Sequence, residues 1–188
     1  MQPLLKNCFE MDKFKEFSLP IKGLKNGKHE FDFEIGSDFF KEFESSPIEE
    51  GNFDVHLIFD KRDSFFELNF DFDGSIKTDC DRCTASIGLP FGGDAFLMVK
   101  TTIEPQEEDA EVVYISPDDS DFNVAKYIYE FICLAIPFHK SYDCENDDPQ
   151  PCDFDILNRL NPSVNEAKIK VEPKKNPFDD LKNIFNGN

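Results

Sequence analysis

Two cysteines near the middle of the chain, Cys80 and Cys83, are spaced so that both can bind one metal ion. Thiols separated by two residues project from the same side of a tight turn, which is the arrangement that one cation requires. Cys144 and Cys152 supply a second pair further along the chain. Four thiolates are a conventional ligand set for structural Zn²⁺. The sequence therefore predicts a structural zinc site formed by Cys80, Cys83, Cys144 and Cys152.

The composition of this site has alternatives. His139 can replace Cys152 as the fourth ligand, which gives a conventional three-Cys, one-His set with less negative charge. Cys144 and Cys152 are eight residues apart, so the second pair departs from the usual spacing. Arg82 and Lys140 are close enough in sequence to offset part of the thiolate charge. Four reduced, metal-free thiols are the other interpretation, because a single Cys-x-x-Cys pair is a motif of low specificity.

Catalytic motifs do not accompany these cysteines. A catalytic metal needs an open coordination position and a nearby general base, and the sequence has no His-Glu pairing of that kind. It also has no nucleophile elbow and no Gly-rich phosphate loop. We therefore predict no catalytic residues and no enzymatic activity.

The charge balance limits the classes of partner. The 188 residues include 39 acidic and 20 basic side chains, which gives a net charge of −19. Such a surface repels nucleic-acid backbones and anionic membranes and attracts basic partners, or it serves only solubility. No apolar run is long enough for a signal peptide or a membrane span, so we expect a cytoplasmic protein. Thiols stay reduced there, which favours metal binding over disulfides.

Alternating apolar and polar residues predict a strand-rich N-terminal half. The clearest case is an antiparallel hairpin whose inner face is rich in phenylalanine. Asp73-Gly74 is a turn signal, and it predicts a further reversal of the chain. The predicted strands cover residues 31–35, 53–60, 66–72, 76–80, 87–91, 96–103 and 112–115.

One principal helix is predicted over 124–135, with its N-cap among Asp118 to Asp121 and its end before Pro137. A shorter helix is expected at 154–160. We predict that residues 1–161 form a single α+β domain. Its core is an antiparallel, partly barrel-like sheet of about six to eight strands with one principal helix. Residues 162–188 are predicted to be a polar linker with a short terminal helix at 179–185.

The order of these features resembles the YceD family. Its motifs are Cys80-x-x-Cys83, a segment with Tyr127-Ile-Tyr-Glu130 and Leu134-Ala-Ile-Pro137, then His139 and Cys144, and last Asn176-Pro-Phe-Asp-Asp-Leu-Lys182. The resemblance covers most of residues 15–185 and matches the form found in Bacteroidetes-type bacteria. Cys80, Cys83 and Cys144 match the family's cysteines, and Glu130 and Pro137 match its helix-end motif. Cys152 and the insertion 147–149 do not align with it.

This resemblance implies a cytosolic, non-enzymatic factor linked to the accumulation of large-subunit ribosomal RNA. The expected partner is a ribosomal RNA precursor or a basic ribosomal protein, with no membrane involved. The net charge favours the basic protein, since the basic residues cluster only near the C-terminus, at Lys168, Lys170, Lys174, Lys175 and Lys182. Two alternatives remain, a zinc-dependent RNA-processing hydrolase and an acidic protein-interaction module unrelated to ribosomes.

Overall fold

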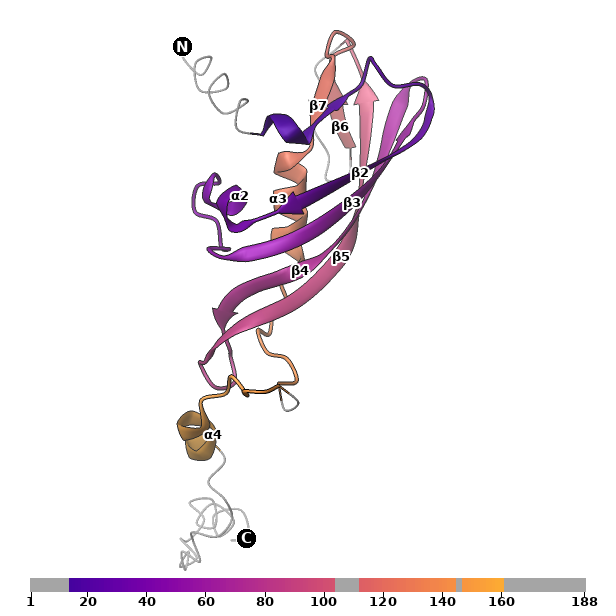
Figure 1. Cartoon of the computed structure of the whole chain (residues 1–188). Coiled ribbons are helices and arrows are strands. Elements are labelled where there is room, and N and C mark those ends of the chain that lie inside the picture. Colours follow the sequence, from indigo (N-terminus) through magenta and orange to yellow (C-terminus); the bar gives the residue numbers. More distant parts are fainter. Residues whose placement is uncertain (1–13, 104–111, 145–146, 161–188) are drawn as a thin grey trace, which may run out of the picture.

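A five-stranded sheet forms the body of the protein, with the strand order β2-β3-β4-β5-β6 (Figure 1). The structure is a computed structural model and describes residues 14–103, 112–144 and 147–160. Strands β1 and β7 pair in a second, two-stranded sheet. The elements in chain order are η1 (Lys15–Phe17), β1 (Ser18–Pro20), β2 (Gly27–Ile35), α2 (Ser37–Lys41), β3 (Gly51–Lys61), β4 (Phe65–Asp79), β5 (Ser86–Thr101), β6 (Val112–Ile115), β7 (Asp121–Asn123), α3 (Ala125–Ala135) and α4 (Phe154–Leu160).

The α+β class is confirmed, but the predicted form of the sheet is wrong in three respects. The described strands divide between two sheets, so the main sheet has five strands where about six to eight were predicted. The main sheet is open, with β2 and β6 at its two edges, so it does not close into a barrel. It is also mixed, because β5 and β6 pair in parallel while the other neighbours are antiparallel. Alternation of apolar residues identifies strands without giving their direction, which is why the sequence did not reveal the parallel pair.

The predicted hairpin is confirmed and extends further than expected. β3 and β4 pair from Gly51 opposite Ile76 to Lys61 opposite Phe66. Because successive side chains point to opposite faces of a sheet, one face of these strands is apolar. Its buried residues are Phe53, Val55, Leu57, Phe59, Phe66, Leu68, Phe70 and Phe72.

The predicted reversal at Asp73-Gly74 is wrong, since β4 continues through both residues. Gly74 lies between Phe53 on β3 and Phe91 on β5. The rings of these two phenylalanines meet edge to face with centroids 5.0 Å apart. A Cβ at this position would clash with the carbonyl oxygen of Asn52. The glycine therefore permits close packing between strands and does not make a turn.

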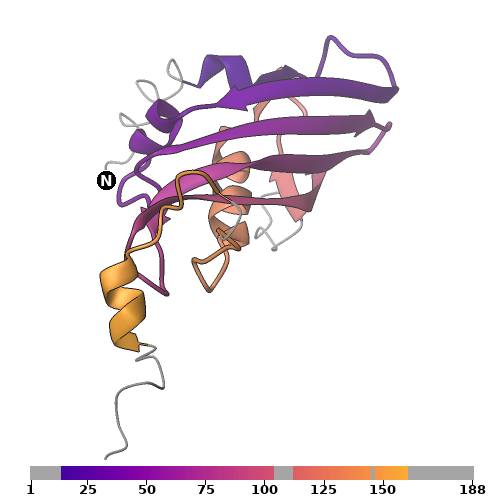
Figure 2. The ribbon, with the colours of Figure 1, turned by 60° about the horizontal axis from the view of Figure 1, so that its bottom comes forward.

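The principal helix α3 packs on the apolar face of the sheet, and Figure 2 shows the strands crossing in front of it. Ile128 and Ile132 are buried, and the Phe131 ring lies 5.2 Å from the ring of Phe70. The helix ends at Ala135, as predicted. Its predicted N-cap is wrong, because β7 intervenes and the side chain of Asn123 accepts a hydrogen bond from the N–H of Ala125 at 3.0 Å.

The second predicted helix is confirmed as α4. The predicted terminal helix at 179–185 and the polar linker lie outside the described residues, as does the boundary after 161. Within the described part of the chain, no helix is long and apolar enough to cross a membrane.

Candidate metal centre

The Cys80–Cys83 pair lies in the turn that joins β4 to β5. The N–H of Cys80 donates to the carbonyl of Ala85 at 2.8 Å, and the N–H of Thr84 donates to the carbonyl of Cys80 at 2.7 Å. Thr84 has a φ of 56°, in the left-handed region that a β-branched residue rarely adopts. This tight closure turns both thiols inward, and both are buried.

The segment after α3 docks against this turn, as Figure 1 shows. The N–H of Asp81 donates to the carbonyl of Lys140 at 2.9 Å, and the N–H of Lys140 donates to the Asp81 carboxylate at 2.7 Å. These reciprocal bonds hold together two segments that are far apart in sequence. They bring the second half of the predicted site beside the first.

All four predicted cysteines meet at this junction. The sulfurs of Cys144 and Cys152 are 2.9 Å apart. Cys83 is in hydrogen-bonding contact with the side chains of Cys80 and Cys152. Cys80, Cys83 and Cys144 are buried, Cys152 is half-buried, and all four are free thiols. The structure therefore brings these four cysteines together, and their role as metal ligands stays a prediction.

The surroundings of the thiols stabilise negative charge on sulfur. The backbone N–H groups of Ala85 and Asp153 lower the pKa of the Cys83 thiol. Arg82 places its Nη2 atom 3.6 Å from the sulfur of Cys144 and 3.7 Å from that of Cys152. The guanidinium thus offsets thiolate charge, as its place in the sequence suggested.

Neighbouring groups oppose complete ionisation in the absence of a cation. The hydrogen bond with Cys152 raises the pKa of Cys144, because this bond favours the protonated thiol. Burial and the negative charge of Cys152 raise the same pKa further. Beside them, the Asp147 carboxylate accepts a 2.6 Å hydrogen bond from the Tyr142 hydroxyl and raises the pKa of Tyr142 to about 12.

The geometry differs from that of a completed metal site. Two ligands of a tetrahedral zinc with bonds of about 2.3 Å lie about 3.8 Å from each other, further than the sulfurs of Cys144 and Cys152. In agreement, no group of three or more His, Cys, Asp or Glu side chains among the described residues has metal-site spacing. The donor type fits zinc, and binding requires the sulfurs to move apart by about 1 Å.

His139, the alternative fourth ligand, is exposed. Its ring lies at the edge of the Phe138 ring, with centroids 5.1 Å apart. None of its described contacts is with a thiol. Cys133 lies on α3, where burial raises the pKa of its thiol.

The helix-end segment 127–139 contributes both to the core and to the surface. Ile128 and Ile132 are buried on the side of α3 that faces the sheet. Toward the C-terminal end of the segment, the side chains of Leu134 and Phe138 are 81% and 92% exposed.

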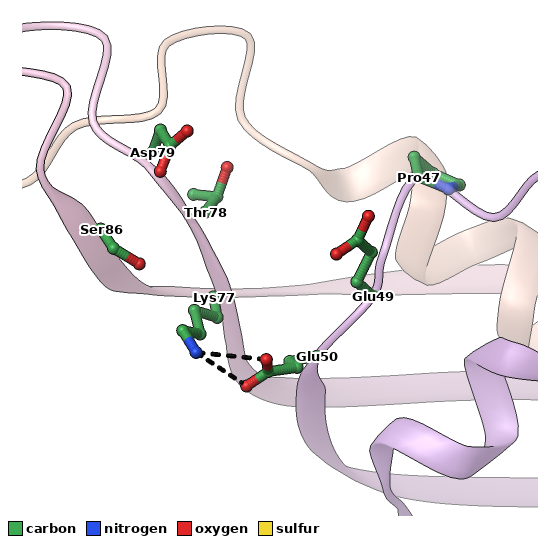
Figure 3. A pocket seen from close by; sticks show the side chains of 7 residues that line it. All are labelled: Pro47, Glu49, Glu50, Lys77, Thr78, Asp79 and Ser86. Atoms are coloured by element: carbon green, nitrogen blue, oxygen red, sulfur yellow. Dashed lines mark hydrogen bonds and ion pairs between the residues drawn. The ribbon is translucent and has the colours of Figure 1, made fainter.

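A hollow of about 400 Å³ lies near the cysteine turn (Figure 3). Its walls include Glu49, Glu50, Lys77 and Asp79. The Nζ atom of Lys77 lies 3.1 Å and 3.2 Å from the two carboxylate oxygens of Glu50, so its charge is paired across the hollow.

Sequence patterns did not reveal the backbone donors to Cys83 or the left-handed Thr84. In the first case, the N–H of Asp153 reaches Cys83 through the docking of a distant segment that no local signal indicated, whereas Ala85 lies two residues away in the same turn. The second could have been suspected, since the tight turn after a Cys-x-x-Cys pair requires an unusual backbone angle.

Comparison with protein families gives a match over residues 68–185 to the family described as "Large ribosomal RNA subunit accumulation protein YceD". The matched region contains all four cysteines, α3 and α4. Comparisons with curated proteins and with solved structures give no match. Since the match covers more than half of the chain, this protein belongs to the YceD family.

Proposed function

We propose that this protein is a non-enzymatic accessory factor that supports the accumulation of large-subunit ribosomal RNA. The observation that carries the proposal is the family match, which spans the cysteine cluster and the principal helix. The proposed location is the cytoplasm, where ribosomal subunits of bacteria assemble and where thiols remain reduced.

A structural zinc held by Cys80, Cys83, Cys144 and Cys152 is part of this proposal. The four thiols come from two segments, and Arg82 and Cys144, which are in contact, lie 62 residues apart in sequence. A cation between these sulfurs favours both thiolates, and so opposes the hydrogen bond, the burial and the repulsion that raise the pKa of Cys144. It also fixes the segment between α3 and α4 to the β4–β5 turn, which limits the conformations of a long loop.

Cys152 is the better candidate for the fourth ligand. Its sulfur lies beside those of Cys83 and Cys144, whereas His139 is exposed next to Phe138. A zinc ion with four sulfur ligands keeps no open position for substrate. This supports a structural role for the metal over the alternative of a zinc-dependent hydrolase.

For the partner, we favour a basic ribosomal protein over the RNA itself. The net charge of −19 opposes close approach to a phosphate backbone. The same charge attracts proteins with basic surfaces, as ribosomal proteins have. The lysine cluster between Lys168 and Lys182 lies outside the described residues.

Depletion of the protein from its host cells tests this function. The expected result is a selective deficit of mature large-subunit ribosomal RNA, with precursors accumulating and small-subunit RNA unchanged. An equal effect on both subunits, or no effect, contradicts the proposal.

A further inference from the structure

The face of the sheet opposite α3 carries rows of side chains that pair across four strands. Residues directly opposite on adjacent strands share a face, so the register gives the rows. Helix α3 packs on the apolar face of the sheet. In Figure 2, the opposite face of β2 to β5 is turned toward the viewer. Two adjacent rows are Glu34–Asp54–Asp73–Gly92 and Asp32–His56–Asp71–Asp94.

These two rows, which we name the acidic rows, hold six exposed carboxylates. Asp54 is directly opposite Asp73, and Asp71 is directly opposite Asp94. Like charges in such positions destabilise a sheet. Among the described residues of these rows, His56 can carry a positive charge. Its Nδ1 atom lies 2.7 Å from the Asp32 carboxylate.

In the neighbouring rows of the same face, the acidic charges are balanced differently. At one end of the sheet, Arg62 forms ion pairs with Asp60 at 2.8 Å and with Glu67 at 3.4 Å. Between this end and the acidic rows, Ile58 and Phe96 flank Asn69. Phe96 is 37% exposed, so the face combines negative charge with apolar contact area. This fold can therefore compensate acidic side chains, and within the described acidic rows such compensation is limited to the pair of His56 with Asp32.

The surface of the acidic rows is also hollowed. A depression of about 470 Å³ is lined by Asp32, Glu34, Asp54, His56, Asp71 and Asp73, together with Phe33 and Val55. Along one strand, same-face carboxylates such as Asp71 and Asp73 recur every two residues. An extended peptide presents alternate side chains with the same period, about 6.6 Å.

From this charge complementarity we propose that the acidic rows are the docking surface for an extended protein segment rich in arginine and lysine. The inference rests on the proposed function, because it identifies where a basic ribosomal protein is held. A phosphate backbone is excluded from this face by the same six carboxylates. The apolar side chains beside the rows accommodate the aliphatic stems of the basic residues.

The test is a binding titration with a fluorescein-labelled peptide of alternating arginine and alanine, using the full chain. The face variant neutralises three acids in the rows, and a control variant makes the same change in net charge elsewhere. The face variant carries Asp54→Asn, Asp71→Asn and Asp73→Asn. The control variant carries Glu44→Gln, Glu49→Gln and Asp155→Asn.

We expect the face variant to bind the peptide about tenfold more weakly than the wild type, and the control variant to bind within about twofold of it. Thermal unfolding checks that weaker binding does not come from loss of fold. Equal loss in both variants means that only overall charge matters, and it overturns the proposal. Binding of a large-subunit RNA transcript in preference to the peptide also overturns it.

Complementation of depleted cells separates this inference from the proposed function. If depletion causes the large-subunit deficit and the face variant does not restore it, both are supported. If the face variant restores large subunits fully, the docking surface is wrong while the family role stands. If depletion causes no deficit, the proposed function fails, and the peptide titration still decides whether the surface binds basic segments.

Discussion

Asp54 on β3 lies directly opposite Asp73 on β4, with both carboxylates exposed on the same face of the sheet. Two negative charges directly opposite each other on neighbouring strands repel each other and reduce the stability of the fold. Such an arrangement persists when the position serves binding, since functional sites are often built at the expense of stability.

Neutralising one member of this pair is therefore expected to stabilise the protein. Asp73→Asn should raise the free energy of unfolding by about 0.2–1 kcal/mol at low salt, because it removes repulsion from Asp54. Urea titration at low and high salt measures the effect, which should shrink as salt screens the charges. Glu44→Gln is the matched control. A decrease in stability for Asp73→Asn would show that the carboxylate has a structural role instead.

The zinc centre gives a prediction of stoichiometry. Protein purified without chelator should contain about one zinc per chain, and Cys83→Ser and Cys144→Ser should abolish it, because each removes a thiolate ligand. Cys133→Ser should retain the metal, since its thiol lies on α3 away from the cluster. Elemental analysis measures the content. Absence of zinc from the wild-type protein would leave four packed thiols.

Arg82 should assist metal binding through its charge. Its Nη2 atom contacts the sulfurs of Cys144 and Cys152, so Arg82→Gln is expected to lower zinc affinity about tenfold without removing a ligand. Competition with a chromogenic chelator measures the affinity, and Arg62→Gln serves as the control because Arg62 pairs with Asp60. Unchanged affinity in Arg82→Gln would limit the guanidinium to a packing role.

Thr84 should be strained in its left-handed conformation, with a φ of 56°. Thr84→Gly is expected to stabilise the fold by about 0.5 kcal/mol, because relief of the left-handed cost exceeds the added chain entropy of glycine. The comparison uses Thr84→Ala, which keeps a Cβ and should gain less. Chemical denaturation gives both values, and destabilisation by glycine would mean that the threonine side chain holds the turn.

His56 should give the acidic rows a dependence on pH. The hydrogen bond that His56 Nδ1–H donates to the Asp32 carboxylate raises the pKa of His56, and the charges of Asp32, Glu30 and Asp71 add to the rise. A raised pKa means that His56 contributes stability below its unfolded value of about 6.5 and loses it as pH rises through the folded value. NMR titration should show the raised pKa, and Asp32→Asn should lower it. An unaltered titration midpoint in Asp32→Asn would refute the pairing.

Local patterns were sufficient to predict the elements that depend on local spacing. The period of apolar residues identified α3 and the β3–β4 hairpin, and Pro137 marked the end of the helix. Asp73-Gly74 was misinterpreted because a turn signal cannot reveal that the rings of Phe53 and Phe91 meet over the glycine.

Of the candidate site, the sequence predicted which cysteines meet but not how they are held. Cys80 and Cys83 share a motif, Cys144 and Cys152 were suggested as a second pair of thiols, and Cys144 also matches the family's cysteines. The contact of Cys152 with Cys83 depends on the docking of Lys140 against Asp81, which is a tertiary relationship. The acidic rows were visible only as alternating charges in each strand, since their pairing required the register between strands.

The central claim is that this chain supports the formation of large ribosomal subunits. The most direct test is a sucrose gradient of ribosomal particles from cells depleted of the protein, with the wild-type chain or Cys83→Ser supplied from a plasmid. We predict a low ratio of large to small subunits after depletion, restored by the wild type and not by Cys83→Ser. A normal ratio in depleted cells would contradict the claim.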